Sequence, residues 1–384
     1  MLLQSTSCKH PPKLLFLVTV DWFFYSHFLS RATAAQKEGY EVVVLTHCNR
    51  HRESIEAAGL RMIPLHIDRR SMNPFSAVLA CLRILRVYRY EHPTIVHQVA
   101  LKPILLGGIA ARLSGVKHIV NAMVGGGYVY TSTSPLMFIA RPVIQLALRV
   151  LLNPQGSRVI FENVDDLESS VHTNQVRASD AVLIRGAGVD PVLYGRKSEG
   201  SGEPVVILAA RLLWDKGIGE FVRAAETLRL RGIHARFVVV GDSDPGNRAC
   251  IDNDTLTRWR QEGIVELWGF RKDMPEVLAQ ASIACLPSYR EGLPKFLLEA
   301  MATGLPCVTT DVPGCREAVS HEDNGLLVPA RDAGALSNAL ERLLLDPPLR
   351  SQMGTRGRQR IIEEFSSTLV EKQTLALYAE VLAQ

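Results

Sequence analysis

The chain has 384 residues, of which 47% are hydrophobic and 21% charged, a composition that excludes a disordered protein and allows two or three domains. Its seven cysteines are scattered singly without a C-x-x-C pair, which suits a reducing cytosol better than a disulfide framework. The first ten residues lack the apolar core of a signal peptide. The longest apolar stretch, 136–152, is interrupted by arginines and is shorter than the ~20 residues of a membrane span.

The charge is distributed unevenly along the chain. Residues 1–195 hold 20 Lys and Arg against 13 Asp and Glu, whereas residues 196–384 hold 23 against 26. A basic first half favours an anionic acceptor or a membrane surface as its partner. Ordinary surface charge is the alternative explanation.

Strand-like and helical segments alternate along the first half. Apolar runs predict strands at 13–20, 41–46, 61–65, 94–97, 118–120 and 158–161. Helical patterns lie between them, at 26–38, 77–90, 104–113, 136–152 and 163–171. Alternation of this kind predicts an α/β fold in which a parallel sheet carries helices on both faces.

A polar, Gly-rich stretch at 197–204, ending in Pro204, indicates an interdomain linker. A second alternating series follows it. Strands are predicted at 205–210, 236–240, 265–267, 283–286, 307–310 and 326–328, and helices at 217–231, 255–262, 274–279 and 295–303. Three helical segments, 334–345, 349–363 and 368–382, close the chain.

The most informative stretch is the nine residues from Glu291 to Glu299. Pro294 suits the first turn of a helix, where its missing N–H costs nothing, and the pattern over 295–303 is apolar almost all round, which predicts a buried helix. Lys295 and Glu299 share one face of that helix, and Glu291 precedes it in a loop whose N–H groups can hold an anion. Two interpretations fit this pattern. The charged groups form a ligand site, or they pair with each other on a helix that is simply buried.

The Glu-x7-Glu spacing is preceded by Leu286-Pro287-Ser288 and followed by Glu299-Ala-Met-Ala-x-Gly304-x-Pro306 and by Asn324-Gly325-Leu-Leu-Val-Pro329. This combination resembles the signature of retaining GT-B glycosyltransferases of family 4 (group 1). The resemblance implies two Rossmann-like domains with parallel sheets that face a central cleft. The implied parts are an acceptor-binding domain at 1–195, a nucleotide-sugar-binding domain at 196–365, and a helix at 366–384 that crosses back to the first domain.

Arg211 and Lys216 lie on a loop that follows a predicted strand and opens a helix, where two cations and a helix N-terminus make a diphosphate site. A solvated loop with two surface bases is the alternative on chemistry alone. The family's R-x4-K-G pattern falls on these residues, which implies that they neutralise the donor diphosphate as the sugar leaves. The resemblance adds Glu291 as a catalytic contact to the sugar hydroxyls and Glu299 as the ligand of the ribose hydroxyls.

Other donor-binding residues are implied by the same resemblance. They lie in loops at predicted strand ends: Gly292, Leu293, Pro294, Lys295, Gly241, Asp242, Phe270 and Arg271. A plain turn is the alternative for Asp242. The nucleotide is expected to be a UDP-sugar used as substrate, with no cofactor and no catalytic metal.

The first half carries the implied acceptor side. Asp21 and Trp22 stand where many relatives have a Gly-Gly loop after the first strand. His97 and the pair Lys102-Pro103 match a bacterial branch that acts on polyprenol-linked or polysaccharide acceptors. The alternative is that His97 is a structural histidine at a strand end, with its ring hydrogen-bonded within the protein.

A Gly-rich turn containing Gly125 and Gly127 follows the strand at 118–120. Relatives often carry a histidine just before this turn, near the reacting sugar, but here the position is Val124. Either the contact is dispensable in this branch, or His97 or Asn121 supplies it.

Two apolar helical segments carry interspersed arginines: Arg83, Arg86 and Arg89 in one, Arg141 and Arg149 in the other. Such helices can lie on an anionic bilayer. The alternative is that they pack on a sheet with their arginines outward.

Together these observations predict a cytoplasmic, metal-independent, retaining glycosyltransferase. It would move a hexose or N-acetylhexosamine from a nucleotide diphosphate sugar to a lipid-linked saccharide, for capsule, lipopolysaccharide or glycan assembly at the cytoplasmic face of the membrane, with no nucleic-acid partner. One alternative is a catalytically degenerate nucleotide-sugar-binding partner of another transferase, which only Val124 supports. Another is a GT-B sugar-nucleotide epimerase, which needs an acid/base set of its own. The sugar, the acceptor, the linkage and the oligomeric state are not fixed by the sequence.

Overall fold

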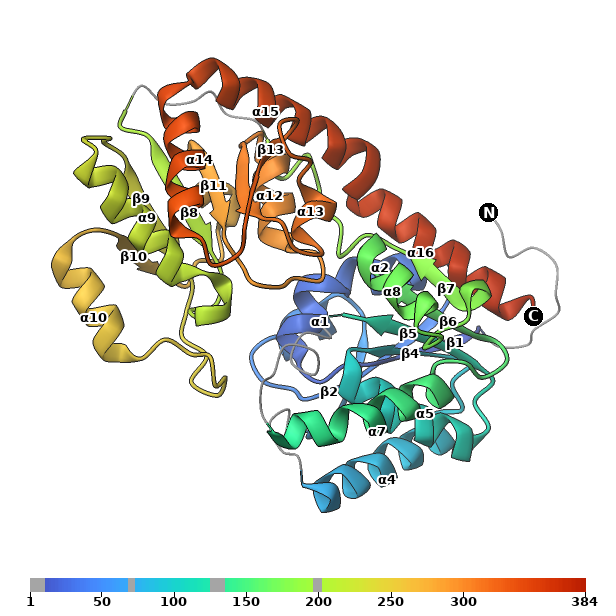
Figure 1. The fold of residues 1–384 in the computed structure, drawn as a ribbon. Helices are drawn as coiled ribbons and strands as arrows, with labels where there is room; N and C mark the ends of the chain where they lie inside the picture. Colours follow the sequence, from blue (N-terminus) through green and yellow to red (C-terminus); the bar gives the residue numbers. More distant parts are fainter. Residues whose placement is uncertain (1–10, 68–72, 125–134, 196–201) are drawn as a thin grey trace. The chain divides into compact units, whose positions relative to one another are not determined.

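The computed structural model describes residues 11–67, 73–124, 135–195 and 202–384, which form two α/β units (Figure 1). One unit comprises Met1–Ala187 and Val370–Gln384, and the other comprises Gly188–Leu369. The chain therefore changes unit at Gly188, before the predicted linker, most of which lies outside the described residues. The last helix belongs to the first unit from Val370 onward.

The first unit is built on a sheet of seven parallel strands in the order β3-β2-β1-β4-β5-β6-β7. The strands are β1 Lys13–Leu17, β2 Glu41–Thr46, β3 Arg61–Pro64, β4 Ile95–Val99, β5 His118–Met123, β6 Ser157–Phe161 and β7 Ala181–Leu183. The central strands β1 and β4 are buried almost throughout, as expected for parallel strands with helices on both faces. The short, polar-flanked β7 was not predicted.

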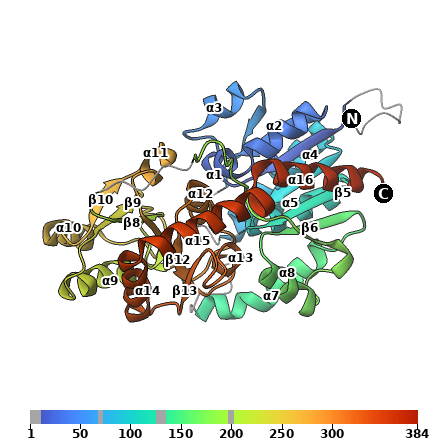
Figure 2. The same ribbon diagram turned by 90° about the horizontal axis from the view of Figure 1, so that it is seen from above.

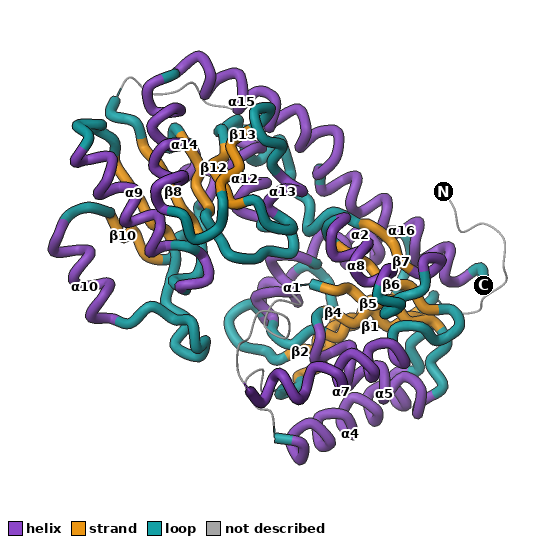
Figure 3. Tube along the Cα trace, viewed as in Figure 1, coloured by secondary structure: helices purple, strands orange, loops and turns teal. Residues whose placement is uncertain are grey.

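Helices cover both faces of this sheet (Figures 2 and 3). They are α1 Asp21–His27, α2 Leu29–Lys37, α3 Arg52–Ala57, α4 Pro74–Glu91, α5 Leu101–Ser114, α7 Pro135–Leu151, α8 Val164–His172, the short 3-10 helix Ala178–Asp180 and α16 Ser367–Leu382. Residues of α1, α2 and α16 share one hydrophobic core with the strands, and residues of α4 and α5 share the core on the other face.

The segment predicted as a loop after β1 is helical, and the predicted helix 26–38 is divided at Phe28. Phe24 and Phe28 both pack against Phe16 of β1, with ring centroids 5.4 and 6.2 Å apart. Burying both rings on one strand starts the helix early and bends it between them. Tertiary packing therefore makes this segment helical where the resemblance had implied a loop.

The second unit contains six parallel strands in the order β10-β9-β8-β11-β12-β13. They are β8 Val205–Ala209, β9 Arg236–Val240, β10 Glu266–Gly269, β11 Ile283–Leu286, β12 Cys307–Thr310 and β13 Gly325–Val328. The helical segments are the 3-10 turn Trp214–Lys216, α9 Ile218–Leu230, α10 Asn253–Glu262, α11 Met274–Leu278, α12 Lys295–Thr303, α13 Cys315–Ala318, α14 Ala333–Leu345, α15 Pro347–Arg360 and the π-helical turn Ile361–Phe365. The predicted bounds of β9, β11, β12 and α12 are confirmed.

Helix α12 lies inside the core of the second unit. Every residue from Phe296 to Thr303 is buried, which confirms the prediction of a buried helix. Pro294 is the N-cap and not the first helical residue, and no side chain caps this helix end. The N–H groups of the first turn are therefore left for the loop in front of the helix or for a ligand.

No helix among the described residues is both long and apolar enough to cross a bilayer.

Candidate active site

Two loops at the carboxyl ends of β8 and β11 are tied together in the second unit. The backbone N–H of Tyr289 donates to the carbonyl of Asp215 at 2.9 Å, and the Ser288 hydroxyl donates to the same oxygen at 3.1 Å. Gly217 has φ +70°, and a Cβ at this position would lie 2.0 Å from the Pro287 carbonyl oxygen. Only glycine allows this approach, which places the preceding Lys216 beside the second loop.

Lys216 and Glu291 form an ion pair at this junction. Nζ of Lys216 lies 2.5 Å from Oε1 of Glu291, and the two side chains are only 19% and 12% exposed. A charge-assisted hydrogen bond with so little solvent around it is stronger than a surface pair. The structure thus brings together two residues that are 75 positions apart in the sequence.

Arg211 lies on the same β8 loop and is paired with Asp244. Its Nη1 lies 2.8 Å from Oδ2 of Asp244, and the arginine side chain is 43% exposed. Gly241 holds the two loops together, since a Cβ there would lie 1.8 Å from the carbonyl oxygen of Ala210. Asp242 accepts a hydrogen bond from the N–H of Ser243 within its own turn. Asp244 was not singled out in the sequence, because it lies 33 residues from Arg211.

Glu299 is the buried carboxylate of α12. Nζ of Lys295 lies 3.6 Å from its Oε1. Burial raises the pKa of Glu299, while the charge of Lys295 and hydrogen bonds with Tyr194 and Lys295 act in the opposite direction. Tyr194 is itself buried, and its pKa is raised by burial and by the neighbouring carboxylate. No sequence signal marked Tyr194, which lies more than one hundred residues before its partner.

The loop in front of α12 is shaped by another close approach. Gly314 has φ +78°, and a Cβ there would lie 2.2 Å from the carbonyl oxygen of Gly292. Leu293 is buried beneath the loop. The backbone of this loop is therefore fixed by packing before any ligand binds.

Phe270 and Arg271 follow β10. The Phe270 ring is exposed, and Arg271 donates from Nε to Oδ1 of Asp273 at 2.8 Å. The Arg271 guanidinium is therefore bound by a carboxylate of its own turn. No group of three or more His, Cys, Asp or Glu side chains in the described part of the chain is arranged to hold a metal ion.

The acceptor-side residues of the first unit are placed differently. His97 is fully buried, its Nδ1 lies 2.6 Å from the Tyr378 hydroxyl, and its ring stacks on Phe16 with centroids 5.0 Å apart. Burial, assisted by the positive charge of Arg31, lowers the pKa of His97 to about 3. The structure thus shows the alternative of a histidine held within the core at a strand.

Asp21 is also buried. Its Oδ2 accepts hydrogen bonds from the N–H groups of Asn49 at 2.6 Å and His51 at 3.0 Å, so it holds the loop after β2. Asn121 is buried on β5, and its amide oxygen and nitrogen have no hydrogen-bond partner among the described residues. Both side chains therefore lie below the surface of the unit.

The other predicted acceptor-side residues that the structure describes lie nearer the surface of the first unit. Trp22 is half-buried, with its ring centroid 5.7 Å from that of Phe23. Lys102 lies near the start of α5 and lines a hollow together with Arg83. Gly125 and Gly127 lie outside the described residues, and Val124 is half-buried at the end of β5.

Two parallel-stranded α/β units form the GT-B fold, and similar solved structures extend over nearly the whole chain. The sucrose-phosphate synthase of Thermosynechococcus elongatus matches with a TM-score of 0.80 at 21% identity, covering 97% of this chain and 99% of that one. HepE of Anabaena, solved in complex with UDP, matches with a TM-score of 0.76 at 18% identity over 96% of this chain and all of that one.

The family follows from the sequence comparisons. The model described as "Glycosyl transferases group 1" matches residues 203–346, and the model "Glycosyl transferase 4-like" matches residues 13–163. The chain belongs to the group 1, family 4 glycosyltransferases.

Two relatives cover most of the chain. The N,N'-diacetylbacillosaminyl-diphospho-undecaprenol alpha-1,3-N-acetylgalactosaminyltransferase of Campylobacter jejuni is 27% identical over 89% of this chain and 92% of that protein. The UDP-Gal:alpha-D-GlcNAc-diphosphoundecaprenol alpha-1,3-galactosyltransferase of Escherichia coli is 27% identical over 76% of this chain and 75% of that protein.

Proposed function

We propose that the protein transfers a hexose or N-acetylhexosamine from a UDP-sugar to a saccharide linked to a polyprenyl diphosphate, in the assembly of a surface polysaccharide or glycan. The reaction would take place at the cytoplasmic face of the membrane, with the enzyme bound peripherally. The names of the Campylobacter jejuni and Escherichia coli relatives support the acceptor class, and the Anabaena structure with UDP supports the nucleotide.

The contact between Lys216 and Glu291 carries this proposal. It places an ammonium group, a carboxylate and the uncapped N-terminus of α12 at one point. Negative charge grows on the diphosphate as the glycosidic bond breaks, and fixed cations lower the barrier most where charge develops. Lys216 and Arg211 are the cations for this task.

Before the donor binds, each of these cations is neutralised by a carboxylate. Lys216 is paired with Glu291, and Arg211 with Asp244. The donor diphosphate would take over both cations, which releases Glu291 to accept hydrogen bonds from the sugar hydroxyls. In the resting protein Glu291 thus neutralises the largely buried Lys216, and Asp244 neutralises the more exposed Arg211.

Glu299 is proposed to bind the ribose. An ionised carboxylate can accept two O–H donors, which replaces the hydration that burial removes from Glu299. Tyr194 and Lys295 hold this carboxylate from the protein side. This arrangement gives the nucleoside end of the donor a fixed attachment point on α12.

Retention of configuration and independence from a metal complete the proposal. Arg211 and Lys216 supply the positive charge at the leaving group, and retention follows from the resemblance of the Glu-x7-Glu pattern. Proton NMR of the product tests the stereochemistry, with an unchanged anomeric configuration expected for an α-linked donor. Turnover in the presence of excess EDTA is expected to stay unchanged, and its loss would contradict metal independence.

The decisive assay is release of nucleoside diphosphate from a panel of nucleotide sugars, with and without a polyprenyl-diphosphate-linked saccharide. Acceptor-dependent release of UDP and elongation of the lipid-linked saccharide are expected. Binding of nucleotide sugar without release would identify a degenerate binding partner, and conversion of the sugar without an acceptor would identify an epimerase.

A further inference from the structure

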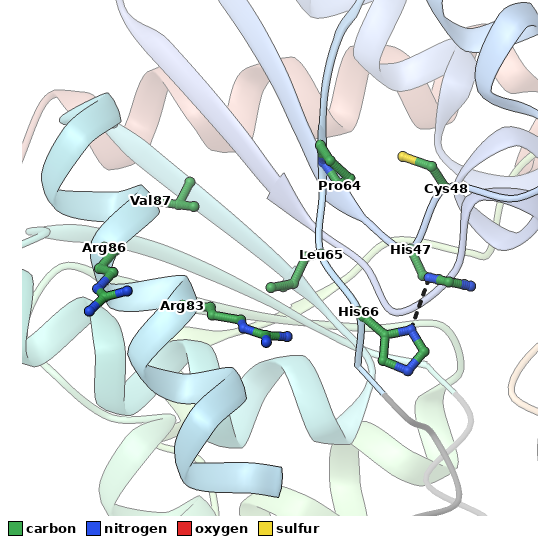
Figure 4. A pocket seen from close by; sticks show the side chains of 8 residues that line it. All are labelled: His47, Cys48, Pro64, Leu65, His66, Arg83, Arg86 and Val87. Carbon is green, nitrogen blue, oxygen red and sulfur yellow. Dashed lines mark hydrogen bonds between the residues drawn. The ribbon is translucent and has the colours of Figure 1, made fainter.

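A hollow of about 560 Å³ lies in the first unit between the end of β3 and the flank of α4 (Figure 4). Its polar lining comes from His47, His66, Arg83 and Arg86. A second hollow, of about 310 Å³, shares His66 and Arg83 with it and adds Lys102 from α5. The proposed donor loops belong to the other unit, so these cations take no part in the donor contacts described above.

The two arginines are not neutralised by any residue that the structure describes. Arg83 and Arg86 lie one helical turn apart on α4, and within the described residues neither makes a hydrogen bond or an ion pair. Arg89, one turn further on, differs because its guanidinium donates to the carbonyl of Leu113 at 3.2 Å. Two exposed guanidinium groups on one face of a helix form a site for a phosphate-bearing anion.

A histidine pair borders the same hollow. Nδ1 of His47 lies 3.3 Å from Nδ1 of His66, as the dashed line in Figure 4 shows. When both rings are neutral, one donates its Nδ1–H to the other, so the accepting ring must carry its proton on Nε2. The pair therefore offers one N–H donor for an anion in addition to the two guanidinium groups.

Next to the arginines, α4 exposes a stripe of large apolar side chains. Phe75, Val78, Leu79 and Leu82 follow the spacing of one helical face, and Phe75 is 85% exposed. Helix α5 packs against α4, and α7 packs against α5. These two helices expose further apolar residues: Ile109, Leu113, Val143, Leu146 and Val150. An exposed apolar surface of this kind marks an interaction site.

We infer that this hollow binds the diphosphate of a polyprenyl-diphosphate-linked acceptor, with the prenyl chain lying along the apolar stripe of α4. The inference rests on the proposed function and names the part of the acceptor that the enzyme holds. Guanidinium and imidazole N–H groups match the diphosphate, and the adjacent apolar stripe matches a lipid. A soluble sugar phosphate would leave that stripe without a partner.

The test measures co-sedimentation of the full chain with phosphatidylcholine vesicles that contain undecaprenyl diphosphate. The double variant Arg83→Gln/Arg86→Gln should bind roughly 10²-fold more weakly, since loss of one charge-assisted contact costs about tenfold. The matched control Arg89→Gln removes the same charge from the same helix and should stay within about fivefold of the parent, as for an exposed surface charge. Arg83→Lys keeps the charge, loses the bidentate geometry and should fall between them.

Three outcomes would overturn the inference. They are absence of binding to these vesicles, equal loss in the Arg89→Gln control, and equally strong binding to phosphatidylglycerol vesicles of the same charge density, which would indicate a general anionic-bilayer surface. Thermal unfolding of each variant shows whether it is folded.

Nucleoside diphosphate release tests the proposed function separately. If the parent elongates the lipid-linked saccharide and the double variant keeps the acceptor KM of the parent, the inference fails while the function stands. If the parent releases nucleoside diphosphate from no nucleotide sugar, the proposed function fails whatever the vesicles show. The expected result is a raised acceptor KM with an unchanged donor KM.

Discussion

The two units hold their cations in opposite ways. In the second unit, Lys216 and Arg211 are each paired with a carboxylate, and glycines that tolerate no side chain fix the loops that carry them. In the first unit, Arg83 and Arg86 stand on the exposed side of α4, and within the described residues they have no partner.

For Lys216, which is only 19% exposed, the physical reason is solvation. A cation that is mostly withdrawn from water needs a partner, because an unpaired buried charge is costly. An exposed cation is solvated by water and needs no protein partner before its ligand binds. We interpret the paired, rigid set as suited to stabilising charge that develops during a reaction, and the unpaired set as suited to binding a charged group that does not change.

The largest expected effect is that of Lys216→Ala. Because the ammonium is placed where charge develops, its loss should lower kcat by roughly 10²–10³-fold. Steady-state kinetics with the donor varied measures this effect, and Lys372→Ala, an exposed lysine of α16, is the control. Near-normal turnover of a folded Lys216→Ala protein would remove this residue from the reaction and erase the contrast between the two units.

Gly217→Ala tests whether the donor loops are rigid. The new Cβ would meet the Pro287 carbonyl at 2.0 Å in addition to adopting a positive φ, which should destabilise the second unit by about 3 kcal/mol or more. Gly232→Ala is the matched control, since Gly232 has φ +75° with nothing within 4 Å, and should cost about 1–2 kcal/mol.

Urea unfolding followed by tryptophan fluorescence measures both glycine variants, because Trp214, Trp259 and Trp268 belong to the second unit. An equal loss of unfolding free energy in the two variants would mean that the loops of the second unit adapt to a side chain and are not rigid.

Glu299→Gln should separate binding from stability. Burial raises the pKa of Glu299 above its ordinary value of 4.5, so the folded state holds its proton to higher pH than the unfolded chain. Stability therefore falls as the pH rises from that ordinary value through the folded pKa, and the loss is complete above it. The glutamine variant lacks this loss and should be the more stable protein at neutral pH.

The same variant should bind the UDP-sugar roughly 10- to 100-fold more weakly, as expected when a hydrogen bond to a charged group is lost. Urea unfolding at several pH values and calorimetric titration of UDP give the two readouts. Unchanged UDP affinity would argue against the ribose contact.

The smallest expected effect is that of Asp244→Asn. Removing this carboxylate leaves Arg211 available to the donor diphosphate, but the pair is partly exposed and contributes at most about 1 kcal/mol. Donor affinity should therefore increase by up to about fivefold, measured as a lower donor KM with little change in kcat. Weaker donor binding would show that Asp244 orients Arg211 instead of competing for it.

The sequence by itself determined the architecture, and it predicted the residues of the donor motif. Periodicity and short apolar runs predicted the alternation of strands and helices in both units, including the bounds of β9, β11, β12 and α12. These patterns act over a few residues, which is why they are legible in one sequence. The spacing of Glu291 and Glu299 and the loop with Arg211 and Lys216 were equally local.

Only the tertiary structure decided which groups face one another. Asp244 on Arg211 and Tyr194 beside Glu299 come from distant positions without a motif. The resemblance placed His97 on the acceptor side, whereas in the structure the Tyr378 hydroxyl, 281 residues away, lies against it inside the core. Such pairings depend on how helices pack on the sheet, and packing joins residues that no local periodicity relates.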